Sequence, residues 1–228
     1  MNTEKYEFIF RRLATILAVS ILTLSLSAAF TGILLAFYYE PSAGGAYESL
    51  KNIATEVPNG SLIRDVHDIA GNGVIVVSLI EIVVMFLGRK FTKSWLTGWI
   101  SVVFFTLNAI ALAWTAMILD WSQLGYWRLS IELQTIEAIP FIGSQLRNIL
   151  TGGGAITTAT VQHLYTIHSY ILSVSAIAIA ITHLGAVLVQ ERQQARLQME
   201  LKAISSTSEP DLTQAEIDSN SLTFTNKN

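Results

Sequence analysis

Four long stretches of this sequence are apolar and carry almost no charge. Three of them, Leu13–Tyr39, Ser94–Leu119 and Asn148–Gln190, contain no Asp, Glu, Lys or Arg, and Ile69–Gly88 contains one, Glu81. A helix crosses a lipid bilayer with about 20 apolar residues. Charged residues make up 14% of this chain, against about 25% in soluble domains. The pattern therefore predicts an all-α fold, a transmembrane four-helix bundle. Its helices are expected near residues 13–38, 66–88, 96–119 and 165–190.

Basic residues gather at three places that four threaded helices would put on one side of a membrane. They are Lys5, Arg11 and Arg12, then Arg89, Lys90 and Lys93, and finally Arg192 and Arg196. Because positive charge marks the cytoplasmic side, we expect both termini to be cytoplasmic, or stromal. This predicts a multi-pass protein, embedded in the lipid of a bacterial inner membrane or a thylakoid membrane. The net charge of −3 argues against nucleic acid as a partner.

The charge pattern also divides the chain into parts. We expect a cytoplasmic tail over 1–12, one bundle domain over 13–190 and a polar cytoplasmic tail over 191–228. The long connection before the fourth helix contains IELQTIEAIPFIGSQLRNIL, whose amphipathic pieces predict surface helices. From Ser205 the tail is rich in Ser, Thr, Glu and Asp, a composition that predicts disorder.

Four ligand-capable residues are spaced as two pairs along two of the predicted helices. His67 and Glu81 are 14 residues apart, and His168 and His183 are 15 apart. In an α-helix these spacings return to within about 40° and about 60° of one face, and separate the side chains by roughly 21–22 Å. Two helices with ligands at two levels can stack two haems across a membrane. Here one of the four positions is a glutamate.

Several motifs resemble one known family, the cytochrome b6 type, the short N-terminal half of the cytochrome b of quinol:cytochrome oxidoreductases. They are TGILLAFYYEP, TEVPNGSLIRDVH, DWSQLGYW, AIPFIG and LYTIH followed by His183, in order, over roughly residues 10–190. The resemblance implies that His67 and His168 ligate a haem b near the outer, quinol-oxidising face. It further implies that Arg64 pairs with a haem propionate, and that Gly32 and Ala116 leave room for the ring.

At the position of the family's inner haem, several residues differ from the family together. His183 matches a ligand of the family's inner haem, but its partner position is Glu81. We therefore expect one haem b, and whether the chain binds a second haem stays open. Three roles for Glu81 stay open too: a pair with His183 that fills the vacated volume, a proton relay near an inner quinone, or an unusual Glu/His haem. Further departures on this side are Val102 for glycine, Ile16 for cysteine, and Val84, Trp95 and Leu188 where basic residues are expected.

The resemblance implies an electron-transfer subunit linked to quinol oxidation, at most one part of a quinol-linked oxidoreductase. Its partners would be quinone and other membrane subunits, such as a subunit IV-like protein. The alternative is a non-catalytic, structural or regulatory paralogue that docks in a respiratory or photosynthetic complex. At the outer face three residues depart from the family: Asp68 replaces a basic residue, Asp120 a proline and His163 an arginine.

Overall fold

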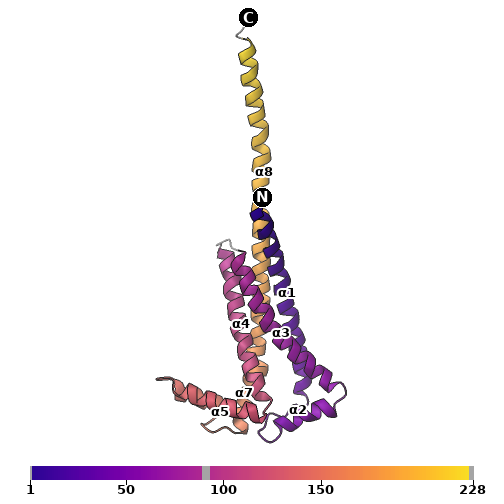
Figure 1. Ribbon diagram of the computed structural model, residues 1–228, viewed down its shortest axis with the longest axis vertical. Coiled ribbons are helices and arrows are strands. Elements are labelled where there is room, and N and C mark those ends of the chain that lie inside the picture. Colours follow the sequence, from indigo (N-terminus) through magenta and orange to yellow (C-terminus); the bar gives the residue numbers. More distant parts are fainter. Residues whose placement is uncertain (1, 89–92, 226–228) are drawn as a thin grey trace. The chain divides into compact units, whose positions relative to one another are not determined.

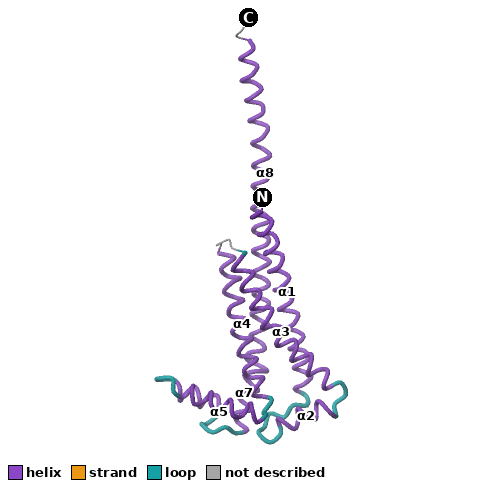
Figure 2. Tube along the Cα trace, viewed as in Figure 1, coloured by secondary structure: helices purple, strands orange, loops and turns teal. Residues whose placement is uncertain are grey.

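Helices form the fold throughout the described part of the chain. The computed structural model describes residues 2–88 and 93–225, without the side chains of 2–8, 93–94 and 206–225, and it contains no strand in those ranges (Figure 2). The chain forms two units, residues 1–187 and 188–228. The elements are α1 (Asn2–Ala36), α2 (Ala46–Thr55), α3 (Gly60–Leu87), α4 (Lys93–Leu119), α5 (Gln123–Glu137), α6 (Gly143–Thr151), α7 (Thr158–Thr166), the π-helix η1 (Ile167–Leu172) and α8 (Ser173–Thr225).

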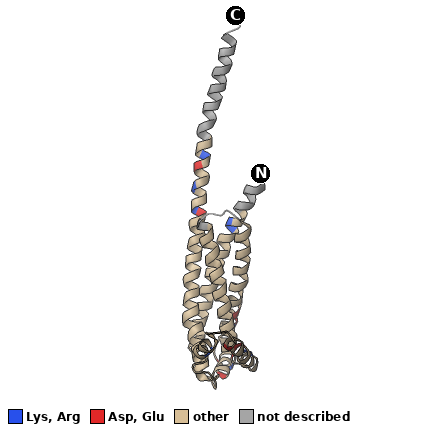
Figure 3. Cartoon of the chain, turned by 90° about the vertical axis from the view of Figure 1, so that its left-hand side faces the viewer, with Lys and Arg blue, Asp and Glu red and all other residues tan. Residues whose placement is uncertain are grey.

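Within the described residues, four helical segments are long and apolar enough to cross a membrane. They are Ile9–Ala36, Gly60–Leu87, Trp95–Leu119 and Thr158–Ser205. Only 22% to 39% of the most apolar part of each span is buried inside the protein, so large apolar side chains face outward. An apolar surface of this extent suits lipid rather than water. Figure 3 shows few charged residues along the middle of the bundle. The predicted transmembrane fold is confirmed.

The core of the first unit is built where α1, α3, α4 and the beginning of α8 meet (Figure 1). Small residues supply many of the contacts, including Ala14 and Ala18 on α1 and Ala176 and Ala180 on α8. Small side chains allow close approach of helices in a membrane, where packing replaces the hydrophobic effect as the driving force. Larger side chains, among them Ile21 and Phe105, fill the remaining space and are fully buried.

Short helices cover one end of the bundle, away from the N-terminus (Figure 1). Buried residues of α2, α4, α5 and α7 form a second apolar cluster there. The surface helices predicted before the fourth span are confirmed, whereas α2 was not predicted. Tyr39 ties this end together by donating a hydrogen bond to the carbonyl oxygen of Leu119 (2.9 Å). Burial raises the pKa of the Tyr39 hydroxyl, so the hydroxyl keeps its proton for this bond.

A π-helical turn corrects the spacing of the two histidines in the fourth span. His168 lies in η1, and a π-turn takes up about one more residue than an α-turn. The 15-residue step from His168 to His183 therefore behaves like the 14-residue step from His67 to Glu81. The turn is held from α4, because Asn108 Nδ2 donates to the carbonyl oxygen of Leu172 (3.0 Å).

The end of the chain differs from what the sequence predicts. α8 continues as a helix to Thr225, so the prediction of disorder from Ser205 was wrong. The segment DLTQAEID contains several good helix formers, and their propensity competes with the polar composition. In the basic connection between the second and third spans, Arg89 and Lys90 lie outside the described residues.

We predict that Asn108→Ala lowers the free energy of unfolding by about 1 kcal/mol, the usual scale for a hydrogen bond between transmembrane helices. The substitution leaves the carbonyl of Leu172 without its side-chain donor on α4. Chemical unfolding in mixed detergent micelles, followed by tryptophan fluorescence, measures the change. Asn72→Ala, at an exposed position of α3, is the control. Equal losses for both variants would contradict the role given to Asn108.

Candidate functional site

The structure brings His67 of α3 and His168 of η1 together. Their ring centroids lie 6.4 Å apart, with the ring planes at 57° to each other. Both side chains are half-buried. The two residues are 101 positions apart in the sequence, and the packing of the spans places them at the same level of the bundle.

Hydrogen bonds fix which nitrogen of each ring carries its proton. His67 Nδ1 lies 2.9 Å from the carbonyl oxygen of Ala28, which can only accept, so Nδ1–H is the donor. His168 Nδ1 lies 2.8 Å from Thr115 Oγ1. The Thr115 hydroxyl donates its own proton to backbone carbonyls of α4, so it accepts from Nδ1–H. In neutral imidazoles this leaves the Nε2 lone pairs for coordination, as is typical of metal-binding histidines.

The geometry of this pair fits two axial ligands of one haem iron. A metal–imidazole bond is about 2 Å long, and the ring centre lies about 1 Å behind its nitrogen, so two rings on opposite sides of one iron have centroids about 6 Å apart. The observed 6.4 Å agrees. A Cβ atom on Gly32 would lie 3.0 Å from His67 Cε1, so glycine keeps the space beside this ring. Ala116, the other small residue predicted here, is exposed and follows Thr115.

Arg64 is held by two carboxylates near this pair. Its Nη2 atom lies 2.7 Å from Oδ1 of Asp120, the residue that follows α4, and its Nε atom lies 3.9 Å from Asp68 Oδ2. The family resemblance implies that Arg64 pairs with a haem propionate, a role that stays a prediction. The structure adds that two of the residues that depart from the family pattern meet at this one arginine.

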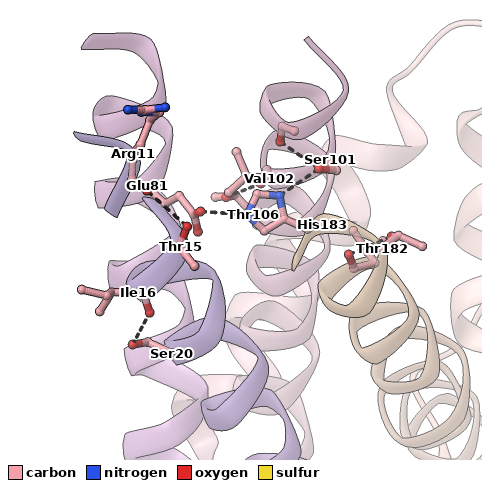
Figure 4. Close-up of polar contacts among 12 residues, drawn as sticks. Arg11, Thr15, Ile16, Ser20, Glu81, Ser101, Val102, Thr106, Thr182 and His183 are labelled. Atoms are coloured by element: carbon pink, nitrogen blue, oxygen red, sulfur yellow. Dashed lines mark hydrogen bonds and ion pairs between the residues drawn. The ribbon is translucent and has the colours of Figure 1, made fainter. Parts of the chain in front are cut away.

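Glu81 and His183 form a buried pair at the second level. Glu81 Oε1 lies 2.8 Å from His183 Nε2, and both side chains are fully buried. On the other side of the ring, His183 Nδ1 lies 2.8 Å from Ser101 Oγ, which itself donates to the carbonyl oxygen of Gly98. Figure 4 shows Glu81 and His183 pointing toward each other, with Ser101 across the imidazole. The second oxygen of Glu81 has no hydrogen-bond partner among the described residues.

This second pair does not fit a haem. Two ligand atoms on opposite sides of one iron would be about 4 Å apart, since each bond is about 2 Å long. Glu81 Oε1 and His183 Nε2 instead bond directly at 2.8 Å. Val102 is fully buried, and a side chain there takes volume that a glycine would leave. Of the three roles considered for Glu81, the direct pair with His183 agrees with this geometry.

The residues that orient the histidines were missed from the sequence. They are Thr31, which lies 3.2 Å from His67 Nδ1, and Thr115 and Ser101. A signal was present, because Ser101 and Thr115 are 14 residues apart, the spacing of His67 and Glu81. Two hydroxyl groups 14 residues apart on the third span therefore lie at the levels of His168 and His183.

Other predicted positions lie around these pairs. Val84 and Trp95 are buried, and the Trp95 indole donates to the carbonyl oxygen of Met85 (2.9 Å). Ile16 is exposed, and Leu188 belongs to the second unit. His163 is exposed and bonds through Nδ1 to the carbonyl oxygen of Ile149 (2.8 Å), a surface contact between α7 and α6.

Comparison with known proteins gives consistent matches. The family described as cytochrome b/b6/petB matches residues 9–191. Cytochrome b6 of Heliomicrobium gestii is 31% identical over 160 residues, which cover 70% of this chain and 75% of that protein. Cytochrome b6 of Mastigocladus laminosus is 32% identical over 142 residues, 62% of this chain and 66% of that protein.

A solved structure has a similar fold. It is described as a hyperthermophilic respiratory Complex III and aligns with a TM-score of 0.63 at 24% identity. The alignment covers 78% of this chain and 47% of the solved chain, so the present chain spans about half the length of that relative.

We predict that Glu81→Ala lowers the free energy of unfolding by about 3 kcal/mol, because it leaves the Nε2 atom of His183 buried without a partner. Glu81→Gln keeps a hydrogen-bonding group and should cost less than half as much. Denaturant titration in detergent, followed by circular dichroism, gives both values. Glu48→Ala, whose side chain is 67% exposed, is the control and should change stability by less than about 0.5 kcal/mol. A Glu81→Ala loss no larger than that of the control would contradict the buried pair.

Proposed function

The chain belongs to the cytochrome b/b6 family, and we propose that it is a membrane electron-transfer subunit with a single haem b held between His67 and His168. The observation that carries this proposal is the 6.4 Å separation of the two rings, with both Nδ1 atoms committed to hydrogen bonds. The Nε2 atoms are the remaining donors, as bis-histidine ligation requires.

The protein's own residues define what such a site does. The haem would supply one-electron redox chemistry when bound. His67 and His168 would both hold the haem iron, and two histidine ligands would disfavour binding of a small ligand to it. Ala28, Thr31 and Thr115 hold the imidazoles in one tautomer and one orientation, so little reorganisation accompanies a change of charge.

The direct bond between Glu81 and His183 supports one haem rather than two. The two levels are roughly 20 Å apart along the helices, too far for useful tunnelling without a second cofactor. Electrons would therefore enter and leave at the end of the bundle that carries His67. A standard path from one membrane face to the other does not operate within this chain alone.

We further propose that the partners are quinol and other membrane subunits of a respiratory or photosynthetic complex. The end that carries His67 lies next to the short helices α2, α5 and α7, which offer a surface for such partners. The positions of Arg11 and Arg12 at the other end of the first span support cytoplasmic termini.

A pyridine haemochrome assay on the purified protein tests the haem number. We expect one haem b per chain, lost in His67→Ala and in His168→Ala because each removes an axial ligand. We expect His183→Ala to keep it, because that ring is bonded to Glu81 and Ser101. Two haems per chain would overturn the single-haem proposal, and so would loss of haem in His183→Ala with retention in His67→Ala.

Redox competence separates an electron-transfer subunit from a structural or regulatory paralogue. A haem that is reduced by quinol analogues, followed by its absorption spectrum, supports electron transfer. A haem that responds to dithionite but not to quinol analogues, in the chain purified with its native partners, supports the structural role.

A further inference from the structure

We propose that Asp120 is a positioning residue that engages Arg64 and thereby lowers the midpoint potential of the haem at His67. The inference rests on the proposed function, because it concerns that same site. Asp120 acts through Arg64, and the quantity that it controls is how much positive charge Arg64 offers to the haem.

The distance between Asp120 and Arg64 is short, and the pair is close to the histidine. Asp120 Oδ1 lies 2.7 Å from Arg64 Nη2, a charge-assisted hydrogen bond. Arg64 comes three residues before His67 on α3, and residues at that helical spacing are neighbours with Cβ atoms about 5–6 Å apart. The cation that Asp120 engages is therefore next to the ligand.

The pair is sheltered enough to hold its geometry. The Arg64 side chain is 33% exposed and that of Asp120 is 42% exposed, so water screens the interaction less than it screens a fully exposed ion pair. The backbone N–H of Asp120 also donates to the carbonyl oxygen of Ala116 (3.2 Å). Asp120 is thus fixed to the end of α4, five residues after Thr115, which orients His168.

The local charge is unbalanced toward the negative. Asp68, the residue after His67, is the second carboxylate near Arg64, at 3.9 Å from its Nε atom. One guanidinium therefore faces two carboxylates. A negative charge near an iron stabilises the oxidised state, which carries one more positive charge than the reduced state. Asp120 lowers the midpoint potential in two ways: by its own negative charge, and by offsetting the positive charge that Arg64 offers to the haem.

The test is an optical redox titration of the purified holoprotein, comparing wild type with Asp120→Asn. The substitution keeps the shape of the side chain and removes its charge, so we expect the midpoint potential to rise. Asp120→Glu keeps the charge and should stay closer to wild type. Asp65→Asn is the matched control, because Asp65 is exposed and adjacent to Arg64 in sequence, but neighbouring residues on a helix do not face each other.

A double-substitution cycle tests whether Asp120 acts through Arg64. In an Arg64→Gln background, Asp120→Asn should raise the potential by less than it does in the wild-type background. An unchanged or lowered potential in Asp120→Asn would overturn the proposal, as would an equal rise in Asp65→Asn or an equal rise in both backgrounds. A wild-type protein that binds no haem would instead overturn the proposed function, so the two failures are distinguishable.

Discussion

The hydrogen bond between Glu81 and His183 is the constraint on which the second level of this bundle depends. A carboxyl group within an apolar span is costly unless it finds a polar partner, and both side chains are fully buried. The pairing satisfies one oxygen of Glu81 and Nε2 of His183 at the same time. It also removes the one histidine nitrogen that could bind a metal at this level. In the single-haem proposal, the stability of this level and the absence of a ligand site there therefore have the same physical cause.

The two levels of the bundle share one arrangement of hydroxyl group and histidine, and they differ in the residue that α3 contributes. At each level a hydroxyl group of α4, Thr115 or Ser101, accepts from the Nδ1–H of a histidine in the fourth span. The π-turn at His168 keeps the two histidines in step with the two positions on α3. The residue that α3 places opposite each histidine then differs: His67, whose ring centroid lies 6.4 Å from that of His168, or Glu81, whose carboxyl group bonds directly to His183 Nε2.

Much of this could be predicted from the sequence, because charge-free spans and residue spacing are strong local signals. The four spans came from the absence of charge and the two levels came from residue spacing. Amphipathic pieces predicted the surface helices, and the family resemblance implied that His67 pairs with His168. The bond between Arg64 and Asp120 could not be predicted, since it joins residues 56 positions apart whose meeting depends on how α3 packs against α4. The π-turn could not be predicted, because one extra residue in a turn does not change the pattern of an apolar span. Helix α2 was missed because its sequence is short and polar, and packing of Ala46 and Ile53 stabilises it.

The single-haem account is tested most directly by locating iron in the protein. An anomalous difference map, measured at the iron absorption edge from crystals of the protein purified with its native cofactor, shows each iron as a separate peak. The account predicts one peak, placed between His67 Nε2 and His168 Nε2, with Glu81 still in contact with His183. A second peak beside His183, with Glu81 displaced from it, would contradict the account.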